Sequence, residues 1–373
     1  MDKRKREYAQ AGVDYTKAQP FREAMQAVGR RTLHFPNKRD VFVNEKGVGT
    51  HGAIFEYRGG LPHLWSKTQE SLGTQNWVAE WMYQNTGKTY YDAIGFNLAQ
   101  IIVVDVIAQG ALPVVFTDEV AADRYDWGMD ELRSKDFAKG IYKACEICGM
   151  ALPAGESSAL RYLIKAELPV KSAPVLSGCI TGIIAPRERL ITGRKLQVGD
   201  RIIAVTSSGI HSNGISLVIK RALTLKDQFL HKLPNGKTLG EETLIPSRCY
   251  VPLAEALLEA KVDIHAFLPG TGGGVSKIAF DKRPFTYRVK NWFDEIPPLF
   301  LFMREIGVAL EDCLTTFNWG SGYYIFVSVD EVEHTIDIGK RAGYELMEIG
   351  AVEKGERRVI FEPEGITLPP PGE

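Results

Sequence analysis

The chain lacks the features that mark several broad classes of protein. Its 373 residues carry a formal net charge of −1, so the charge balance gives no reason to expect nucleic acid or an anionic membrane as a partner. No uninterrupted apolar run approaches the roughly 18 residues of a membrane span. The charged start, from Met1 to Arg6, has no apolar stretch behind it and does not resemble a secretory signal. We therefore expect a folded cytoplasmic protein that binds neither nucleic acid nor a membrane.

Cysteine is scarce and irregularly spaced. The chain has five cysteines, and an odd, scattered set without an export signal favours reduced thiols. Cys145 and Cys148 form a C-x-x-C pair inside a helix-like segment, and no second pair or nearby histidine pair completes a zinc site. We expect both thiols to be buried for structural reasons.

The common nucleotide-binding motifs are also missing. There is no G-x-x-x-x-G-K-[ST], which excludes the P-loop class, and no protein-kinase signature. Residues 47–52 read G-x-G-x-x-G, but a strand-like segment follows them where a dinucleotide fingerprint requires a helix. A Rossmann fold is therefore excluded, and two interpretations of this loop stay open: a plain turn, or a glycine loop that lets backbone approach a ligand.

Strand-like and helix-like segments alternate along the chain, which predicts an α/β fold in both halves. The length predicts two or three domains, and a polar stretch at 187–195 gives domains 1–186 and 187–373. Periodicity predicts helices at 20–31, 76–82, 92–110, 130–150, 215–220, 247–260, 297–306 and 331–342, with a short helix from 275. It predicts strands at 41–43, 53–57, 61–67, 112–116, 175–184, 202–205, 323–329, 345–352 and 358–361, and a turn at 153–158.

The stretch Thr206–Val218 carries the densest set of chemically active residues. It follows the apolar run 202–205 and precedes the helix-like run 215–220. Ser212 or Asn213 is a plausible N-cap, and free N–H groups at such a helix start favour an anion. His211 stands at the mouth of this turn. The alternative is a tight strand-to-helix turn with a surface histidine.

Several carboxylates lie near the expected ends of strands and helices. They are Glu70, Asp105, Asp118 and Glu156, and such groups suit Mg²⁺, whereas the glycine-rich turns suit phosphates. Together they predict a phosphate-handling enzyme. Each carboxylate also has a structural alternative, since Glu70 could pair at a strand end, Asp105 could be a paired buried acid and Glu156 could be an ordinary turn residue.

Segments in the same order along nearly the whole chain resemble the phosphoribosylformylglycinamidine cyclo-ligase (AIR synthetase) family. The 207–218 segment, S-S-G-I-H-S-N-G-I-S-L-V, is similar to the family's S-S-G-x-H-S-N-G-Y-S-L-V. Further resemblances are A-G-V-D at 11–14, Q-G-A-L-P at 109–113, P-S-R-C-Y-V at 246–251, T-G-G-G at 271–274 and T-F-N-W-G at 316–320.

The departures from the family pattern lie in the first half of the chain. The family's D-G-V-G-T-K becomes E-S-L-G-T-Q at 70–75, so Glu70 keeps a carboxylate and Gln75 replaces a lysine. The family's G-G-E-T-A-E-M becomes A-G-E-S-S-A-L at 154–160, which keeps Glu156 and loses the second glutamate. The family's V-N-D becomes V-V-D, ending at Asp105.

The resemblance implies a two-domain fold whose N-terminal sheet pairs across a homodimer, with a mixed α/β C-terminal domain. It implies a C–N-forming ligase of purine biosynthesis that uses ATP and Mg²⁺ to close formylglycinamidine ribonucleotide to aminoimidazole ribonucleotide. The implied catalytic residues are His211 and Asp105, and the implied metal ligands are Glu70, Asp105 and Glu156. The implied ATP- and phosphate-binding residues are Gly47, Gly49, Gly52, Thr74, Ser212, Asn213, Thr271, Gly272 and Gly273.

Two alternatives remain at this point. One is another ATP-dependent enzyme of the same superfamily, similar to selenophosphate synthetase or thiamine-monophosphate kinase. The other is a dimeric binding protein that kept the fold and lost turnover.

Overall fold

A computed structural model describes residue 7 and residues 9–10, 13–14, 16–48 and 52–372. The chain divides into two compact units. Unit 1 comprises Met1–Val106 and Pro113–Ile183, and unit 2 comprises Ile107–Leu112 and Ile184–Glu373.

Unit 1 is built on a four-stranded sheet with strand order β3-β6-β4-β5. Its strands are β3 (Leu64–Ser71), β4 (Leu112–Ala122), β5 (Ala151–Ala159) and β6 (Val175–Ile184), and a separate pair is formed by β1 (Val41–Val43) and β2 (Phe55–Tyr57). The helices are α2 (Gln19–Thr32), α3 (Gln75–Thr86), α4 (Tyr91–Ala108) and α5 (Glu131–Cys148), with short 3₁₀ turns η1 (Phe35–Arg39), η2 (Glu45–Gly47) and η3 (Tyr125–Met129).

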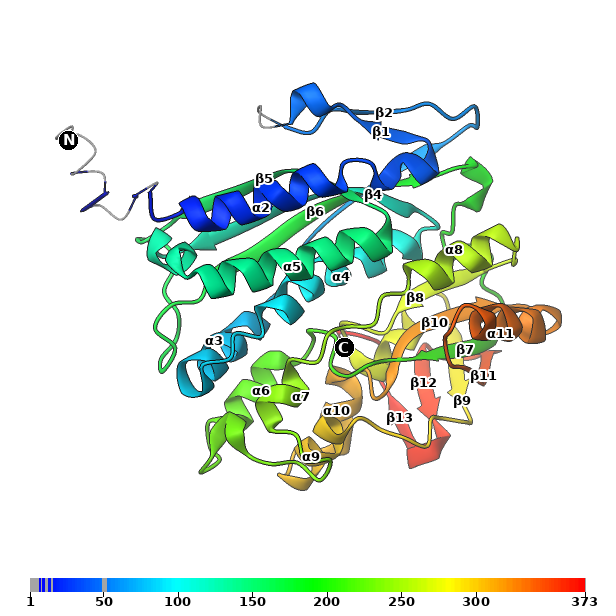
Figure 1. The fold of residues 1–373 in the computed structure, drawn as a ribbon. Helices are drawn as coiled ribbons and strands as arrows, with labels where there is room; N and C mark the ends of the chain where they lie inside the picture. Colours follow the sequence, from blue (N-terminus) through cyan, green and yellow to red (C-terminus); the bar gives the residue numbers. More distant parts are fainter. Residues whose placement is uncertain (1–6, 8, 11–12, 15, 49–51, 373) are drawn as a thin grey trace. The chain divides into compact units, whose positions relative to one another are not determined.

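Glycines allow the helices of unit 1 to approach their neighbours closely. A Cβ on Gly95 of α4 would collide with the carbonyl of Phe137 on α5, and a Cβ on Gly140 of α5 would collide with the carbonyl of Asp92. On α2, a Cβ at Gly29 would lie 2.9 Å from the carbonyl oxygen of Leu152 on β5. The helices therefore form a tight layer along the sheet (Figure 1).

Helix α4 is long and apolar enough, by length and composition alone, to cross a membrane. However, 78% of that window is buried inside the protein, between α5 and the sheet. Ile102 of this helix reaches the sheet at Gly178 of β6, where an added Cβ would lie 3.2 Å from the Ile102 Cδ1 atom. The burial identifies α4 as the core helix of unit 1.

Unit 2 contains a seven-stranded sheet with strand order β13-β12-β9-β11-β7-β10-β8. All its recorded pairings are antiparallel except that of β12 with β9. The strands are β7 (Arg201–Thr206), β8 (Ala266–Pro269), β9 (Phe285–Val289), β10 (Ser321–Val327), β11 (Leu346–Lys354), β12 (Arg358–Phe361) and β13 (Ile366–Leu368). The helices are α6 (Ile215–Ala222), α7 (Leu239–Thr243), α8 (Val251–Glu259), α9 (Pro298–Glu305), α10 (Leu310–Thr316) and α11 (Val332–Arg341), with 3₁₀ turns η4 (Arg187–Arg189), η5 (Gln228–Leu230), η6 (Gly274–Ala279), η7 (Val329–Glu331) and η8 (Glu362–Glu364).

The structure corrects several local predictions. The predicted turn at 153–158 is wrong, because these residues belong to β5, which pairs in parallel with β4. As an edge strand, β5 tolerates Pro153. The N-cap of α6 is Gly214, with φ of 77°, and neither Ser212 nor Asn213 caps the helix. The predicted helix 247–260 begins only at Val251, next to a proline in its first turn.

Candidate functional site

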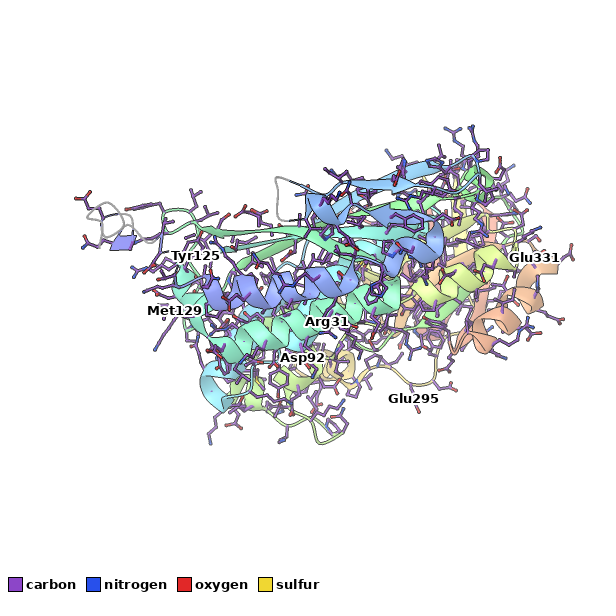
Figure 2. The ribbon with its side chains drawn as sticks, turned by 45° about the horizontal axis from the view of Figure 1, so that its top comes forward. Arg31, Asp92, Tyr125, Met129, Glu295 and Glu331 are labelled. Atoms are coloured by element: carbon purple, nitrogen blue, oxygen red, sulfur yellow. The ribbon has the colours of Figure 1, made fainter. Side chains whose placement is uncertain are left out.

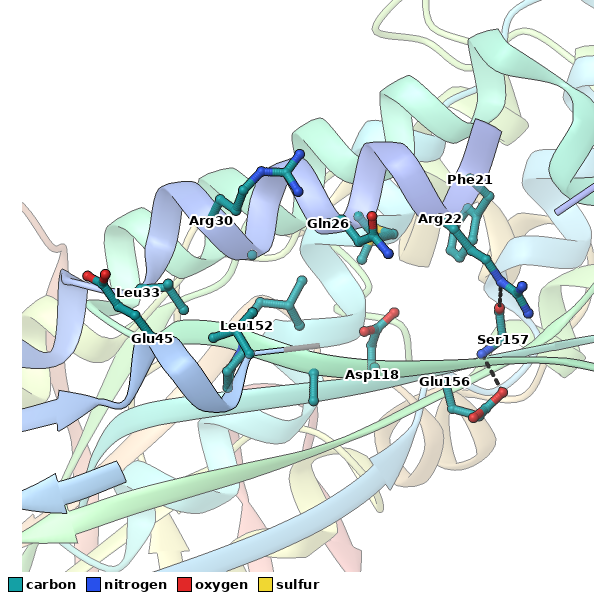
Figure 3. A pocket seen from close by; sticks show the side chains of 16 residues that line it. Phe21, Arg22, Gln26, Arg30, Leu33, Glu45, Asp118, Leu152, Glu156 and Ser157 are labelled. Carbon is teal, nitrogen blue, oxygen red and sulfur yellow. Dashed lines mark hydrogen bonds between the residues drawn. The ribbon is translucent and has the colours of Figure 1, made fainter. Parts of the chain in front are cut away.

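A cavity of about 910 Å³ lies in unit 1 between α2 and the strands β4 and β5. Figure 3 shows that α2 forms one wall and the two strands form the other. The apolar part of its lining consists of Phe21, Met25, Leu33, Val48, Leu152 and Pro153, and the polar or charged part includes Arg22, Gln26, Arg30, Glu45, Asp118, Glu156 and Ser157. The lining is therefore mixed, and a concave cavity in which polar groups are placed among apolar side chains is a common form of small-molecule site.

Asp118 points from β4 toward α2 in this cavity (Figure 3). Its side chain is 6% exposed, and among the described residues no other residue is recorded as donating a hydrogen bond to its carboxylate. Burial raises its pKa to about 7, its own backbone N–H acts in the opposite direction, and Glu156 adds to the increase. Asp118 can therefore either accept a hydrogen bond or, when protonated, donate one to a ligand near neutral pH.

Two polar contacts hold α2 over the cavity. Arg22 donates from Nε to the Ser157 hydroxyl at 3.1 Å and from a terminal nitrogen to the Tyr125 hydroxyl at 3.4 Å. Tyr125, labelled in Figure 2 at one end of η3, donates in turn to the Ser157 carbonyl at 3.1 Å. A Cβ on Gly155, which also lines the cavity, would collide with the Asp118 carboxylate, so a larger residue here would displace that side chain.

The glycine loop lies partly at the cavity. Glu45 and Val48, which flank Gly47 in and after η2, line the cavity, so Gly47 belongs to the segment at its rim. Gly49 lies outside the described residues. Gly52 is exposed, and among the described residues none beyond its chain neighbours comes within 4 Å of where its Cβ would be.

The structure does not gather the three predicted metal ligands at one place within a chain. Glu70 is exposed on β3 and Glu156 is exposed on β5, and these strands are the two opposite edges of the sheet. Three strand spacings separate them, which amounts to about 14 Å. Asp105 is half-buried on α4. Among the described residues, no group of three or more His, Cys, Asp or Glu side chains could hold a metal ion.

Strand pairing places a second glutamate beside Glu156. Glu119 of β4 is its register partner, and its carboxylate accepts a hydrogen bond from the Ser177 hydroxyl at 3.0 Å. The Glu156 carboxylate accepts one from the Ser157 N–H at 2.8 Å. Thr74, also predicted as a binding residue, is exposed at the N-cap of α3.

A second cluster forms in unit 2, where three loops meet at one edge of the sheet. The 207–214 loop follows β7, the 270–274 loop follows β8, and the 318–320 loop precedes β10. Strand β10 pairs antiparallel with both neighbours, Ser321 with Thr206 and Tyr323 with Pro269, so the start of β10 lies between the ends of β7 and β8. This edge therefore brings together motifs that are about 110 residues apart in the sequence.

His211 is buried in this second cluster, with 4% of its surface exposed. Its Nε2 atom accepts the backbone N–H of Ser208 at 3.0 Å and that of Arg248 at 3.3 Å, so Nε2 carries no proton and the ring is neutral. Burial lowers its pKa to about 3, and the Arg248 guanidinium acts in the same direction. The alternative of a surface histidine is therefore wrong, because His211 is an interior side chain that links its own loop to the loop around Arg248.

Asn318 fastens the same loop from the other side. Its Oδ1 accepts the Ser207 hydroxyl at 3.2 Å and the Gly320 N–H at 3.0 Å, and its Nδ2 donates to the Gly209 carbonyl at 2.8 Å. Asn318 is 2% exposed, so these bonds are shielded from water. The T-F-N-x-G motif therefore supports the His211 loop.

Three of the predicted phosphate-binding residues in this cluster, Ser212, Gly272 and Gly273, have left-handed backbone. Ser212 has φ of 59° and follows His211 at 50°, which is uncommon for residues with side chains. In the other turn Gly272 and Gly273 have φ of 75° and 97°. Thr271 and Ser212 are buried, whereas Asn213 is half-buried and Gly272 is exposed, so this part of the cluster opens to solvent.

Sequence reasoning missed the role of two residues. Asp118 is among the carboxylates predicted to be chemically active but not among the implied binding residues. The predicted strand ends before Asp118 and gives no reason for its burial. Glu119 gave no signal at all, since its position beside Glu156 depends on the pairing of β4 with β5.

Two family models match the chain. Residues 75–184 match "AIR synthase related protein, N-terminal domain", and residues 197–362 match "AIR synthase related protein, C-terminal domain". The phosphoribosylformylglycinamidine cyclo-ligase of Pyrococcus horikoshii is 31% identical over 363 residues, which covers 97% of this chain and 99% of that protein. The protein of the same name from Lactobacillus acidophilus is 31% identical and covers 95% and 99%.

Solved structures share the fold at low sequence identity. Thiamine-monophosphate kinase from Stenotrophomonas maltophilia has a TM-score of 0.57 at 16% identity and covers 90% of this chain and 96% of that chain. The hydrogenase maturation protein HypE in complex with ATP has a TM-score of 0.55 at 17% identity and covers 86% and 87%. At these identities the likeness concerns the fold alone.

Proposed function

The chain belongs to the phosphoribosylformylglycinamidine cyclo-ligase family, and we propose that it closes the imidazole ring of aminoimidazole ribonucleotide from formylglycinamidine ribonucleotide and ATP, releasing ADP and phosphate. The observation that carries this proposal is the end-to-end match with cyclo-ligases at 31% identity. The thiamine-monophosphate kinase-like alternative has only a shared fold at 16% identity in its favour.

ATP occupies the unit 1 cavity in this proposal. Met25 and Leu33 on the α2 side and Leu152 on the β5 side offer apolar surface to a purine ring, and Asp118 is a buried carboxyl that can pair with the polar edge of a base. The segment around Gly47 at the cavity rim would then cover the phosphates, as the sequence predicted.

We place the proposed Mg²⁺ ion at the pair Glu156 and Glu119, of which only Glu156 lines the cavity. Mg²⁺ commonly takes one or two carboxylates from a protein and further oxygens from phosphate and water. Glu156, with its neighbour Glu119, satisfies that requirement, and no cluster of three acids is needed. When bound, the ion would neutralise charge on the transferring phosphoryl group. Glu70 and Asp105 remain proposed ligands.

Ring closure requires that the formyl oxygen, which is a poor leaving group, becomes a good one. Phosphorylation of the formyl oxygen by ATP makes that oxygen a leaving group, and the neighbouring nitrogen then attacks the carbon, so phosphate departs and the ring closes. His211, with its Nε2 lone pair already engaged, positions the loops that hold the substrate. Ser212, Asn213 and the Thr271–Gly273 turn bind phosphate.

We also propose a homodimer built on the sheet of unit 1. Trp65 on β3 and Val175 on β6 are 43% and 47% exposed, so part of the apolar surface of this sheet is open to solvent. If β5 of one protomer lies beside β3 of its partner, Glu156 comes near the partner's Glu70. The dimer would thus bring together two of the three predicted metal ligands. We propose that the protein is located in the cytoplasm, in keeping with its five free cysteines.

The direct test is turnover. Purified protein is mixed with ATP, Mg²⁺ and formylglycinamidine ribonucleotide, and aminoimidazole ribonucleotide is followed against a reaction without ATP. We expect one ADP for each product molecule. Absence of product while ATP still binds would refute the cyclo-ligase assignment and leave an ATP-binding relative with another substrate.

A further inference from the structure

Three residues of unit 2 enclose a small open space at the sheet edge described above. A Cβ built on Gly272 would lie 3.8 Å from Nδ2 of Asn213 and 3.9 Å from Nζ of Lys277. Gly272 has no Cβ, so this position is empty and both nitrogens face it. We call Asn213, Gly272 and Lys277 the Gly272 cradle.

The two nitrogens are spaced to share one ligand. Because both lie within 4 Å of the same point, they are at most about 8 Å apart, a gap that one phosphate group can bridge with two hydrogen bonds of about 2.8 Å. Gly272 is exposed, so a ligand can enter from solvent. Its φ of 75° also suits glycine, which keeps the space free of a side chain.

The Lys277 ammonium is held in place by the turn that it overlooks. It donates a hydrogen bond to the carbonyl of Thr271, the residue immediately before Gly272. On the opposite side, among the described residues no residue is recorded as accepting a hydrogen bond from the Asn213 side-chain amide. The cradle thus combines a fixed positive charge with an amide donor, and its recorded neighbours near Gly272 include no carboxylate.

We propose that Lys277 and Asn213 bind a phosphate monoester over Gly272, and that in the proposed reaction this group is the 5′-phosphate of the ribonucleotide substrate. The assignment of the substrate rests on the proposed function. The sequence motifs assign Thr271, Gly272 and Gly273 to phosphate, but they do not include Lys277, which supplies the charge. ATP is the other possible source of phosphate, and the test separates the two.

The experiment compares Lys277→Gln with Lys282→Gln, which removes an equal charge at an exposed lysine five residues further along. A lost charge-assisted hydrogen bond should raise KM for the ribonucleotide roughly 10- to 100-fold, with kcat and KM for ATP within about twofold of wild type. Lys277→Arg should recover part of the loss. The Lys282→Gln control should match wild type.

Binding of ribose 5-phosphate, measured by calorimetry without turnover, keeps this proposal distinct from the proposed function. We expect Lys277→Gln and Asn213→Ala each to weaken that binding, with melting temperatures recorded to confirm folding. Unchanged binding in both folded variants, or a raised KM for ATP alone, would overturn the proposal. If wild type binds ribose 5-phosphate through Lys277 but forms no product, the result supports phosphate binding at the Gly272 cradle and refutes the cyclo-ligase assignment.

Discussion

Replacing His211 tests whether this residue positions loops or transfers protons. His211→Ala removes the acceptor of two backbone N–H groups, those of Ser208 and Arg248, in a site that is 4% exposed. Each buried donor left without a partner costs about 1–3 kcal/mol, so the variant should lose roughly 2–6 kcal/mol of unfolding free energy. His211→Gln, whose Oε1 can reach the position of Nε2, should lose about half as much or less.

The pH dependence gives a second, independent readout. Burial lowers the pKa of His211 to about 3 from its ordinary 6.5, so the unfolded chain binds this proton more readily than the folded one. The stability of wild-type protein should therefore fall as pH drops from about 6.5 toward 3, by at most roughly 4 to 5 kcal/mol from this group. His211→Gln should lack that part of the decline.

The assay is denaturant unfolding between pH 4.5 and 8, followed by tryptophan fluorescence, to which Trp319, buried next to Asn318, contributes. Product formation is measured across the same range. We predict that His211→Gln keeps most of kcat and the wild-type pH profile. If Gln abolished turnover as fully as Ala while remaining as stable as wild type, His211 would be an acid–base group and the positioning role would be refuted.

Three further predictions follow from other contacts. Asn318→Ala should lose about 2–4 kcal/mol of unfolding free energy, since it breaks three buried hydrogen bonds. A variant as stable as wild type would show that the 207–214 loop keeps its conformation without Asn318. The pKa of Asp118 in the folded protein is raised to about 7 from 3.8, so the stability of the protein should decline as pH rises from about 4 to 7. Asp118→Asn should remove this decline in denaturant unfolding, and it should weaken ATP binding measured by calorimetry. An unchanged Kd for ATP would exclude contact between Asp118 and ATP. Gly155→Ala should weaken ATP binding about tenfold, because its Cβ collides with the Asp118 carboxylate, whereas Gly87→Ala, with no atom within 4 Å of its Cβ, should leave Kd unchanged.

Much of the secondary structure could be read from the sequence because it depends on local patterns. The apolar spacing in 20–31 predicted α2, and structure places it at Gln19–Thr32. Strand 175–184 was predicted with its observed bounds. Cys145 and Cys148 are buried on α5, as their place in a helix-like segment indicated.

Local patterns failed where neighbouring strands decide the outcome. Residues 153–158 contain Pro153, Gly155 and two serines, which is the composition of a turn. They form β5 because β4 lies alongside and satisfies their backbone groups. For the same reason β4 continues through Asp118 to Ala122, beyond its apolar segment.

By itself the sequence determined the family, the alternation of strands and helices, and the residue types that serve the chemistry, because ordered motifs and periodicity are written along the chain. Only the tertiary structure decided which of these residues meet. It placed Glu70 and Glu156 on opposite edges of one sheet, buried Asp118 beneath α2, and turned His211 inward onto two backbone N–H groups. Burial and hydrogen-bond partners depend on segments far apart in the chain, and they set the charge state on which each proposed role rests.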